Sequence, residues 1–542
     1  MAQAIVKVVD GRAVVRFSGP ETIATMLAEA QTAAILAQAA SADADEARDE
    51  AVAATANKAD IDGENITDTG AFRSAIQAAR AIYLPGGTNV SSVLQAAFDA
   101  ASDGDVLQLV PIAGADVFLN SAVTLSKRIT IITQASFGVV GAIAGIAMTA
   151  VGAVWQGGRF FGNRTSGQVG IRNSGSLNAV RDVAFELLDK GIHQPASSGY
   201  MNVYDRCRAR NNVTAHLHLE DGVGPRVLGC FGDTDGAWYS GSYVSPTDGA
   251  IWLQTEGAIF IGNDFIHSGG LKIEASSARS IEWLLSVSNY WDSTNSGPGI
   301  HIINNQASRY IRGLFFAQEW SATGHKGIKV EGTGDIDGIY LSAPTFHNNV
   351  FEAVDLQAGK NIFISDPAFL GNNGTVPSGW GITKTVSASS VVVNTAGRVR
   401  INNGQIDGQG MRWNTTPEYQ VYAGPNARDL VVNGTDIGSQ VVVSKVYIDA
   451  SASGVRFINC PGLVGYNRGK ATVANGTTSV TVTHGLSFTP QDKDIFVTPH
   501  TGWGSTTKWW IDDVTSTTFK IVVDANPGLG FEFSWQAWGG DL

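Results

Sequence analysis

Three acidic residues follow similar apolar stretches in the middle of the chain. Asp264 lies in IFIGNDF, Asp292 in LLSVSNYWD and Glu319 in LFFAQEW, and Asp366 in IFISDPAF extends the alignment. Hydrolysis of a glycosidic bond needs two carboxyl groups, about 5–5.5 Å apart for retention or about 6.5–9.5 Å apart for inversion. The acid of such a pair needs a raised pKa, which burial or a neighbouring carboxylate provides. Asp292, Glu319 and Asp264 are therefore the candidate catalytic residues.

Aromatic residues accompany these acids. Tyr290 and Trp291 precede Asp292, and Trp320 follows Glu319. Flat rings pack on sugar faces, whereas carboxylates bind hydroxyl groups and transfer protons. We therefore predict that these three aromatic residues bind a carbohydrate. The alternative is that the acids only cap turns and that the tryptophans pack at a subunit interface.

A second group of candidates lies in GDTDGAWYSGSYVSPTD, an insertion rich in aromatic residues. Binding residues are concentrated on loops, so the insertion suits a substrate-binding loop, although an ordinary surface loop is equally compatible. Its candidate substrate-binding residues are Asp233, Asp235, Trp238 and Tyr239.

β-Elimination on a uronate-containing polymer is the competing chemistry. It needs a base and a group that neutralises the uronate carboxylate. The same region holds suitable basic residues, namely His267, Lys272, His301, His325, Lys326 and His347. Of these, His347 is also a candidate for substrate binding. Hydrolysis is favoured, because lone histidines are more often structural and no Asp-rich calcium cluster is apparent. We predict neither a metal site nor a cofactor.

A repeat must position these residues. A glycine followed by a short apolar run recurs from about residue 105 to 466, as in GIRN at 170, GIHQ at 191, GAIW at 249, GLKI at 270, GIHI at 299 and GIKV at 327. Such periods, built from strands without helices between them, are typical of a solenoid. Equivalent positions of neighbouring coils then lie about 4.8 Å apart. Cys207 and Cys230 occupy matching places in this repeat, and we expect their thiols to stack inward. The sequence predicts an all-β protein built on a parallel β-helix.

Other segments flank the repeat. Residues 1–22 contain a short β unit, and residues 23–60 are rich in Ala, which predicts one long helix. That helix has a narrow apolar seam, so a trimeric bundle is expected, with a solvated linker helix as the alternative. Residues 61–104 are predicted as a linker and a capping helix that begins at Ser91 or Ser92. Residues 467–542 alternate with period two, which predicts a small antiparallel β-sandwich.

Charge and hydropathy exclude several classes of partner. The formal net charge is −12, which disfavours nucleic acid, because phosphate binding needs a cationic surface. No apolar run reaches about 18 residues, so no membrane insertion is expected. The N-terminal residues lack the basic and apolar regions of a secretory signal.

Together these segments resemble the tailspike depolymerases of bacteriophages, which have a right-handed β-helix of the pectate-lyase type. The stretch TNVSSVLQAAFDAASDGDVLQLVP resembles the start of such a β-helix, where a helix caps the first coil. The segment ATVANGTTSVTVTHGLSFTP is similar to small C-terminal domains of phage tail proteins. The resemblance covers nearly the whole chain in architecture.

The resemblance implies a homotrimer on the phage virion that acts at the bacterial cell surface. It implies attachment to a tail or baseplate protein through residues 1–22, and trimerisation or carbohydrate binding by residues 467–542. The implied partner is a bacterial surface polysaccharide, which an endo-acting glycoside hydrolase would depolymerise. A lyase, a non-catalytic receptor-binding tail fibre and a secreted pectate-lyase-like enzyme are the alternatives. The absent secretory signal and the Ala-rich segment disfavour the last of these.

Overall fold

The computed structural model describes residues 5–9, 12–16, 79–196, 199–233, 246–292, 297–322, 324–373, 389–409, 417–441, 444–500 and 504–539. The chain divides into two units, Met1–Gln77 and Ala78–Leu542. In the first unit, β1 (Ile5–Val9) and β2 (Arg12–Arg16) pair as an antiparallel hairpin. The Ala-rich helix predicted for residues 23–60 lies outside the described residues.

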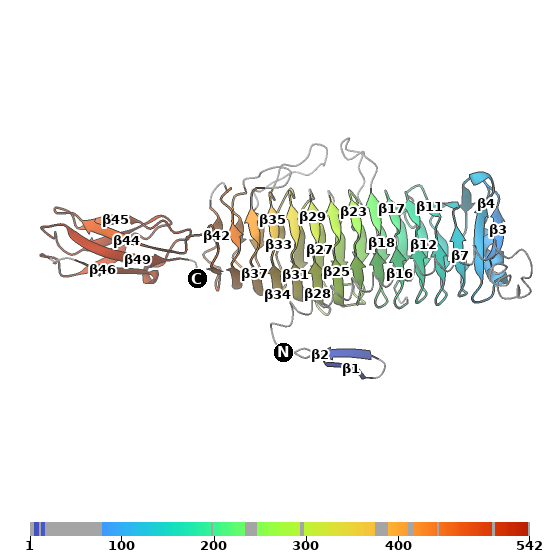
Figure 1. Ribbon diagram of the computed structural model, residues 1–542, viewed down its shortest axis with the longest axis horizontal. Coiled ribbons are helices and arrows are strands. Elements are labelled where there is room, and N and C mark those ends of the chain that lie inside the picture. Colours follow the sequence, from blue (N-terminus) through green and yellow to red (C-terminus); the bar gives the residue numbers. More distant parts are fainter. Residues whose placement is uncertain are drawn as a thin grey trace, which may run out of the picture. The chain divides into compact units, whose positions relative to one another are not determined.

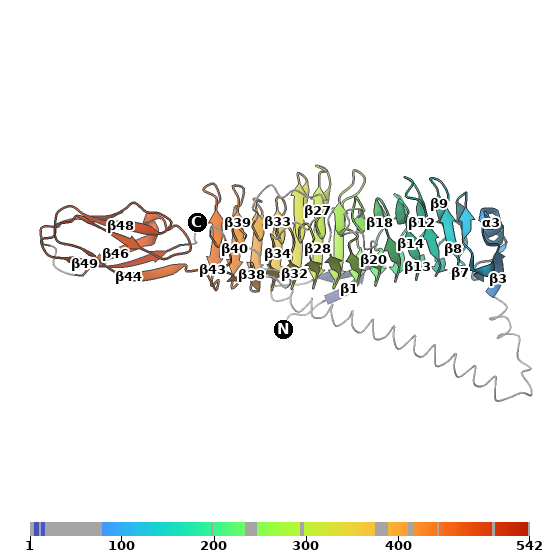
Figure 2. The ribbon, with the colours of Figure 1, turned by 90° about the horizontal axis from the view of Figure 1, so that it is seen from above.

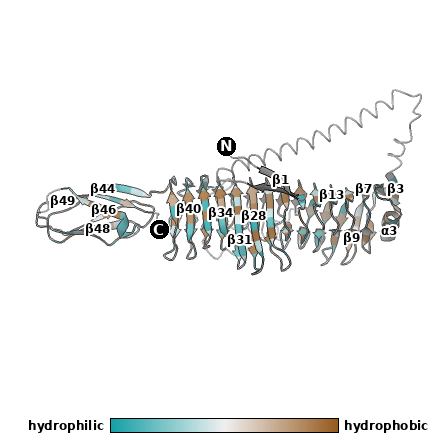
Figure 3. Ribbon diagram, turned by 90° about the horizontal axis from the view of Figure 1, so that it is seen from below, coloured by the Kyte–Doolittle hydropathy of each residue, from teal (hydrophilic) through white to brown (hydrophobic). Residues whose placement is uncertain are grey.

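Three parallel sheets form the main body of the second unit (Figure 1), and each coil of the chain adds one strand to each sheet. We call them sheets I, II and III in the order in which a coil visits them. Parallel crossovers of this kind are right-handed, and the fold is a right-handed parallel β-helix, as predicted. Coloured by hydropathy, its strands alternate between hydrophobic and hydrophilic residues (Figure 3), as expected when one face of a strand is buried.

Sheet I has 15 strands. They are β3 (Ala79–Leu84), β4 (Val106–Pro111), β7 (Thr130–Thr133), β10 (Val154–Gln156), β13 (Ala179–Arg181), β16 (Val203–Asp205), β19 (Arg226–Leu228), β22 (Ile259–Ile261), β25 (Ile281–Val287), β28 (Tyr310–Ala317), β31 (Asp335–Ser342), β34 (Lys360–Ser365), β37 (Arg398–Asn402), β40 (Asp429–Asn433) and β43 (Arg456–Ile458).

Sheet II has 13 strands and carries most of the predicted site residues. They are β5 (Val117–Leu119), β8 (Ser136–Val139), β11 (Arg159–Phe161), β14 (Ala184–Glu186), β17 (Arg208–Arg210), β20 (Phe231–Asp233), β23 (Asp264–Ile266), β26 (Tyr290–Asp292), β29 (Trp320–Ala322), β32 (Thr345–His347), β35 (Ala368–Leu370), β38 (Gln405–Asp407) and β41 (Asp436–Ile437).

Sheet III also has 13 strands. They are β6 (Val123–Leu125), β9 (Ala144–Met148), β12 (Val169–Asn173), β15 (Lys190–Gln194), β18 (Ala215–Leu219), β21 (Ile251–Leu253), β24 (Leu271–Glu274), β27 (Ile300–Asn304), β30 (Ile328–Gly332), β33 (Val354–Leu356), β36 (Val391–Val393), β39 (Val421–Ala423) and β42 (Val446–Ile448).

The only α-helix of the described residues, α3 (Ser91–Ala100), lies at the N-terminal end of the coils (Figure 2). Its buried face, which includes Leu94 and Phe98, belongs to the same hydrophobic core as the coils. The parallel sheet starts earlier than expected, because β3 and β4 pair within and beside the segment predicted as linker and capping helix. No helix of the described residues is long and apolar enough to cross a membrane.

From β7 to β40, a two-residue turn joins each sheet I strand to the following sheet II strand. Its first residue often has a left-handed backbone, as at Ser288 (φ 54°) and Gln318 (φ 53°), and its second residue points into the core. Cys207 and Cys230 occupy this second position in successive coils and are buried, as predicted. Burial and the neighbouring Cys230 hold the pKa of the Cys207 thiol well above its ordinary value. These thiols are therefore inert packing residues.

Residues 466–538 form two three-stranded antiparallel sheets. One contains β44 (Tyr466–Val473), β49 (Phe531–Trp538) and β46 (Ile495–Pro499), and the other contains β45 (Ser479–Thr483), β48 (Thr518–Val523) and β47 (Trp509–Asp512). They enclose a core of their own that includes Phe519, Phe533 and Trp535, whereas Trp510 and Trp538 are exposed. This arrangement is a small β-sandwich.

Candidate functional site

Two columns of outward-facing residues run across sheet II from β20 to β32. In the first column, Asp264, Tyr290 and Trp320 pair in register on neighbouring strands. In the second column, Asp292 and His347 lie two strands apart in register. Successive residues of a strand face opposite sides, so the first and third residue of each three-residue strand point outward together. The repeat therefore places five predicted site residues on one side of sheet II, where Asp292 (6% exposed) and His347 (5% exposed) are buried and Asp264, Tyr290 and Trp320 are more accessible.

Asp233, Asp264 and Asp292 form an acidic cluster on this surface. Burial raises the pKa of the Asp264 carboxyl, and the charges of Asp292 and Asp233 raise it further. Its Oδ1 atom is buried and accepts no hydrogen bond. By contrast, the Tyr290 hydroxyl donates a hydrogen bond to Asp292 Oδ2 at 3.1 Å. A carboxyl group with a raised pKa next to a hydrogen-bonded carboxyl group is the kind of pair that acid–base catalysis uses.

Aromatic rings border the acidic cluster. Trp320 is 40% exposed, and its ring lies edge-on to Tyr290 at 6.2 Å and to His347 at 5.7 Å. The residues around it line a depression of about 640 Å³. Its lining residues are Gly262, Asn263, Asp264, Ser288, Asn289, Tyr290, Gln318, Trp320, Ala343 and Thr345. An exposed indole beside carboxyl groups offers a sugar both a stacking face and polar partners.

No family model matches the sequence, and no curated protein matches it. Solved structures do. The tailspike protein of E. coli bacteriophage HK620 in complex with pentasaccharide aligns with 87% of this chain and 95% of its own, at 9% identity and a TM-score of 0.46. A variant of that tailspike with the same ligand aligns at 10% identity and a TM-score of 0.44, over 86% and 94% of the two chains.

A further similar structure is the Agl-KA catalytic domain, at 13% identity and a TM-score of 0.38. The alignment includes 69% of this chain and 66% of that domain, so the chain spans just under two thirds of its length.

Glu319 and Trp291 lie inside the β-helix, which corrects the predicted pairing of Glu319 with Asp292. Glu319 is fully buried and accepts hydrogen bonds from Ser286 Oγ (2.9 Å), Asn289 Nδ2 (3.0 Å) and Trp291 Nε1 (2.8 Å). Trp291 is the middle residue of β26 and stacks on Phe265 at 5.4 Å. A polymer on the surface cannot touch either side chain.

The turn between sheets I and II explains the position of Glu319. In register, Glu319 matches Asn289 and Asn263, not Asp292, because Trp320 pairs with Tyr290. Asn263 Nδ2 donates to Asn289 Oδ1 at 2.8 Å, so Glu319 ends a buried ladder of polar side chains. Burial raises the pKa of Glu319 to about 7. Asp366 is the first residue of such a turn (φ 52°) and accepts a hydrogen bond from Asn403, so it caps a turn.

Three predicted binding residues, Asp235, Trp238 and Tyr239, lie outside the described residues. Asp233, at the start of the same insertion, contributes to the acidic cluster, and its Oδ1 atom is 3.6 Å from His267 Nδ1. Asp233 therefore lies in the acidic cluster. The assignment of Asp235, Trp238 and Tyr239 to a substrate-binding loop stays a prediction.

Most of the bases considered for elimination lie away from the acidic cluster. Lys272 and His301 pair in register on sheet III. Lys272 Nζ contacts Asp248 and Glu274 at 2.8 and 2.9 Å, and His301 Nε2 contacts Glu331 at 2.8 Å. Lys326 forms ion pairs with Glu352 and Asp355, and burial lowers the pKa of His325 to about 4.

The sequence analysis missed one group of potential ligands. Among the described residues, the group of three side chains within reach of a single metal ion is His193, His218 and Glu220, on sheet III. The spacing of GIHQ and AHLHLE would have aligned the two histidines only if the register between those coils had been known.

Proposed function

We propose that this chain is the protomer of a phage tailspike that binds a bacterial surface polysaccharide and hydrolyses its glycosidic bonds on the outer face of sheet II. The observation that carries the proposal is the position of Asp264, on the strand between those of Asp233 and Asp292 and in the depression that the exposed ring of Trp320 also lines. Burial and the charges of the two neighbouring carboxyl groups raise the pKa of Asp264.

In this mechanism Asp264 is the general acid and Asp292 the general base. Asp292 lies one strand from Asp264 and two residues further along, which places their Cα atoms about 8 Å apart. Side chains that keep a separation similar to that of these Cα atoms place the two carboxyl groups in the range of about 6.5–9.5 Å, which leaves room for a water molecule and inverts the anomeric configuration. Asp292 takes a proton from that water as its oxygen attacks the anomeric carbon. Asp264 gives its proton to the departing glycosidic oxygen.

The remaining residues of this surface bind the sugar or adjust the pKa of Asp264. Trp320 and Tyr290 present ring surface to the sugars, and His347 lies at the edge of Trp320. The negative charge of Asp233 adds to burial and to the charge of Asp292 in raising the pKa of Asp264. The same proposal includes a homotrimer on the virion, attached to a tail or baseplate protein through residues 1–22, with the C-terminal β-sandwich serving trimerisation or carbohydrate binding.

The test is depolymerisation by the full-length chain. Purified protein is incubated with a panel of capsular, exopolysaccharide and O-antigen preparations, and chain length and new reducing ends are measured. We expect Asp264→Asn and Asp292→Asn each to lower the rate by about 10²–10⁴-fold, the usual contribution of a positioned acid or base. Asp366→Asn is the matched control, because Asp366 only caps a turn and Asn tolerates the left-handed backbone there. It should retain the full rate.

The outcomes separate the candidate functions. Polymer that is bound but never shortened would overturn the enzyme and favour a receptor-binding tail fibre. Products with the ultraviolet absorbance of a new C=C bond would overturn hydrolysis and favour a lyase. Equal loss of activity in Asp366→Asn and Asp264→Asn would overturn the assignment of the acid.

A further inference from the structure

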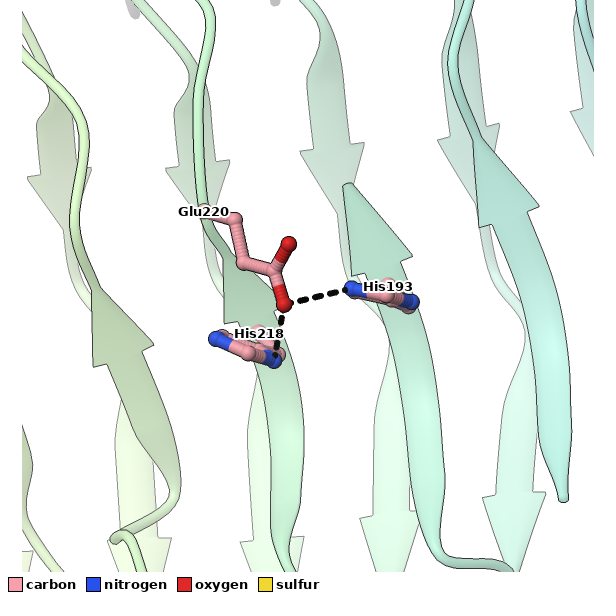
Figure 4. A group of neighbouring side chains, drawn as sticks. All are labelled: His193, His218 and Glu220. Atoms are coloured by element: carbon pink, nitrogen blue, oxygen red, sulfur yellow. Dashed lines mark ion pairs between the residues drawn. The ribbon is translucent and has the colours of Figure 1, made fainter. Parts of the chain in front are cut away.

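Three side chains that can ligate a metal converge on the outer face of sheet III (Figure 4). His193 on β15 and His218 on β18 pair in register, and Glu220 follows β18. The ligand atoms of the three residues all lie within 4.8 Å of one another. The two histidines come from adjacent coils, so an ion held here would join one coil to the next.

The distances between these atoms match the edges of a coordination sphere. Glu220 Oε1 lies 3.1 Å from His193 Nε2 and 3.4 Å from His218 Nδ1. A tetrahedral ion with ligands at about 2.0–2.1 Å separates its ligand atoms by about 3.3 Å. Both nitrogens are buried without a well-aligned hydrogen bond, although the Glu220 carboxylate contacts each of them. Buried polar atoms without a well-aligned partner call for an explanation.

The surroundings of His218 fix which of its nitrogens faces Glu220. His218 Nε2 donates to Gln254 Oε1 at 3.2 Å, and the ring stacks on Trp252 at 3.9 Å with an interplanar angle of 1°. An outer-shell hydrogen bond of this kind orients metal-bound histidines. With Nε2 engaged by Gln254, the Nδ1 lone pair of His218 faces a Glu220 carboxylate oxygen, a repulsive contact that a cation between them would relieve.

Glu220 and His193 provide the rest of the site. The second oxygen of Glu220 accepts a hydrogen bond from the backbone N–H of Ala196 at 3.0 Å, which holds the carboxylate in place. The side chains of His193 and Glu220 are 15% and 28% exposed, whereas that of His218 is 2% exposed. The site is thus open to solvent on one side. An ion bound by all three side chains needs the lone pair of His193 Nε2 to point toward it. Rotation of the His193 ring about χ2, a soft torsion, provides that orientation.

We infer that His193, His218 and Glu220 bind one divalent transition-metal ion of the Zn²⁺ class, which links two coils of the β-helix and leaves a coordination position open to solvent. Two imidazole nitrogens and one carboxylate suit such ions, whereas Ca²⁺ and Mg²⁺ prefer oxygen ligands. The inference does not depend on the proposed hydrolysis, because the three ligands belong to sheet III and the hydrolytic surface to sheet II.

A similar pair on the same sheet provides the control. His301 Nε2 lies 2.8 Å from Glu331 Oε1, but Lys329 contacts the other carboxylate oxygen at 2.6 Å. There the carboxylate charge already has an ammonium partner, and in the part of the chain that the structure describes no third ligand completes a metal-binding group around this pair. Glu331→Gln therefore removes a carboxylate in a comparable setting without touching the inferred site.

The experiment measures Zn²⁺ binding to the full-length chain after treatment with a chelator and dialysis. Isothermal titration should show one ion per chain, and Co²⁺ in its place should give visible d–d bands. We expect Glu220→Gln to weaken binding by at least about 100-fold, because loss of an outer-shell partner alone costs about 10- to 100-fold. Glu331→Gln should leave the affinity unchanged. Zn²⁺ should also raise the Tm of the unaltered chain but not that of Glu220→Gln.

Two results would overturn the inference. One is the absence of saturable Zn²⁺ uptake by the unaltered chain. The other is equal weakening by Glu220→Gln and Glu331→Gln. His193→Gln is a second variant at the more exposed of the two histidines, and circular dichroism establishes that each variant is folded. Because these readouts need no polysaccharide, a failure here is distinct from a failure of the proposed hydrolysis.

Discussion

Glu319 carries an ionisable carboxyl group into the interior of the β-helix. It accepts hydrogen bonds from Ser286, Asn289 and Trp291, three donors that support its charged form. Burial outweighs them and raises its pKa from 4.5 to about 7. The folded chain therefore prefers a protonated Glu319 over a pH range in which the unfolded chain prefers the carboxylate.

This difference predicts a pH dependence of stability. Since the folded pKa is raised, the stabilising contribution is complete below about pH 4.5 and is lost as the pH rises to about 7. A shift of this size corresponds to about 3 kcal/mol in the free energy of unfolding. We expect Glu319→Gln to remove that slope, whatever its effect on the absolute stability. Denaturant unfolding at several pH values measures the absolute stability and its slope with pH. Equal slopes for the unaltered chain and Glu319→Gln would contradict the prediction.

Asp264 illustrates how residue chemistry depends on register. An aspartate at this distance from a tryptophan in the sequence could equally belong to an ordinary surface loop. Pairing β20, β23 and β26 places it between two other carboxyl groups, and burial together with their charges raises its pKa. The electrostatic environment of Asp264 thus depends on the pairing of three coils.

At the scale of elements, a β-helix is stabilised by inward side chains that stack from coil to coil. Phe160 on β11 is fully buried between Phe137 at 5.2 Å and Phe185 at 5.8 Å. Its neighbour Phe161 faces outward, with Arg159 above its ring. Phe160 and Phe161 have the same side chain and adjacent positions. A comparison of the same substitution at both positions therefore isolates the effect of facing the core.

We expect Phe160→Ala to lower the free energy of unfolding by about 3–5 kcal/mol, the usual cost of a Phe-sized cavity. Phe161→Ala should cost clearly less, because its ring is only partly buried. Denaturant titration followed by circular dichroism compares the two. Equal losses would contradict the assigned register of β11. In a solenoid each coil contacts only its neighbours, so neither change should alter the proposed activity of the surface on β20–β32.

The sequence was sufficient to predict the stacking of coils, and insufficient to predict which side of a strand faces in. Recurrent Gly-apolar units define the repeat, and the matching positions of Cys207 and Cys230 follow from it. Glu319 was placed on the wrong side, because a slip of one residue at a two-residue turn exchanges inward and outward positions. Trp291 was misassigned for the same reason. β3 was missed because no earlier coil precedes it to reveal the repeat.

At the scale of the whole molecule, the outer face of sheet I carries a row of aromatic rings. Trp283, Phe315, Tyr340 and Phe363 come from four successive strands, with ring centroids 6.3, 4.8 and 5.2 Å apart. Trp283 is 65% exposed. Contiguous apolar surface of this kind marks an interaction site, because exposed rings are costly in water.

This row predicts how three copies of the chain assemble. If it forms the interface of the proposed homotrimer, a charge placed in it must be buried unpaired on assembly, which costs several kcal/mol per ion. We expect Tyr340→Asp to convert the trimer to monomers, measured by size-exclusion chromatography with light scattering. Trp283→Asp is a second variant in the same row.

The matched control for assembly is Trp320→Ala, which removes an exposed ring from sheet II. It should leave the trimer intact, because it alters the proposed sugar-binding surface and not the row on sheet I. A trimer that survives both Asp variants would move the interface away from sheet I. Loss of the trimer in Trp320→Ala alone would place it on sheet II, where it would cover Asp264 and be incompatible with hydrolysis there. The oligomeric state of these three variants therefore tests the assembly and the location of the proposed active surface together.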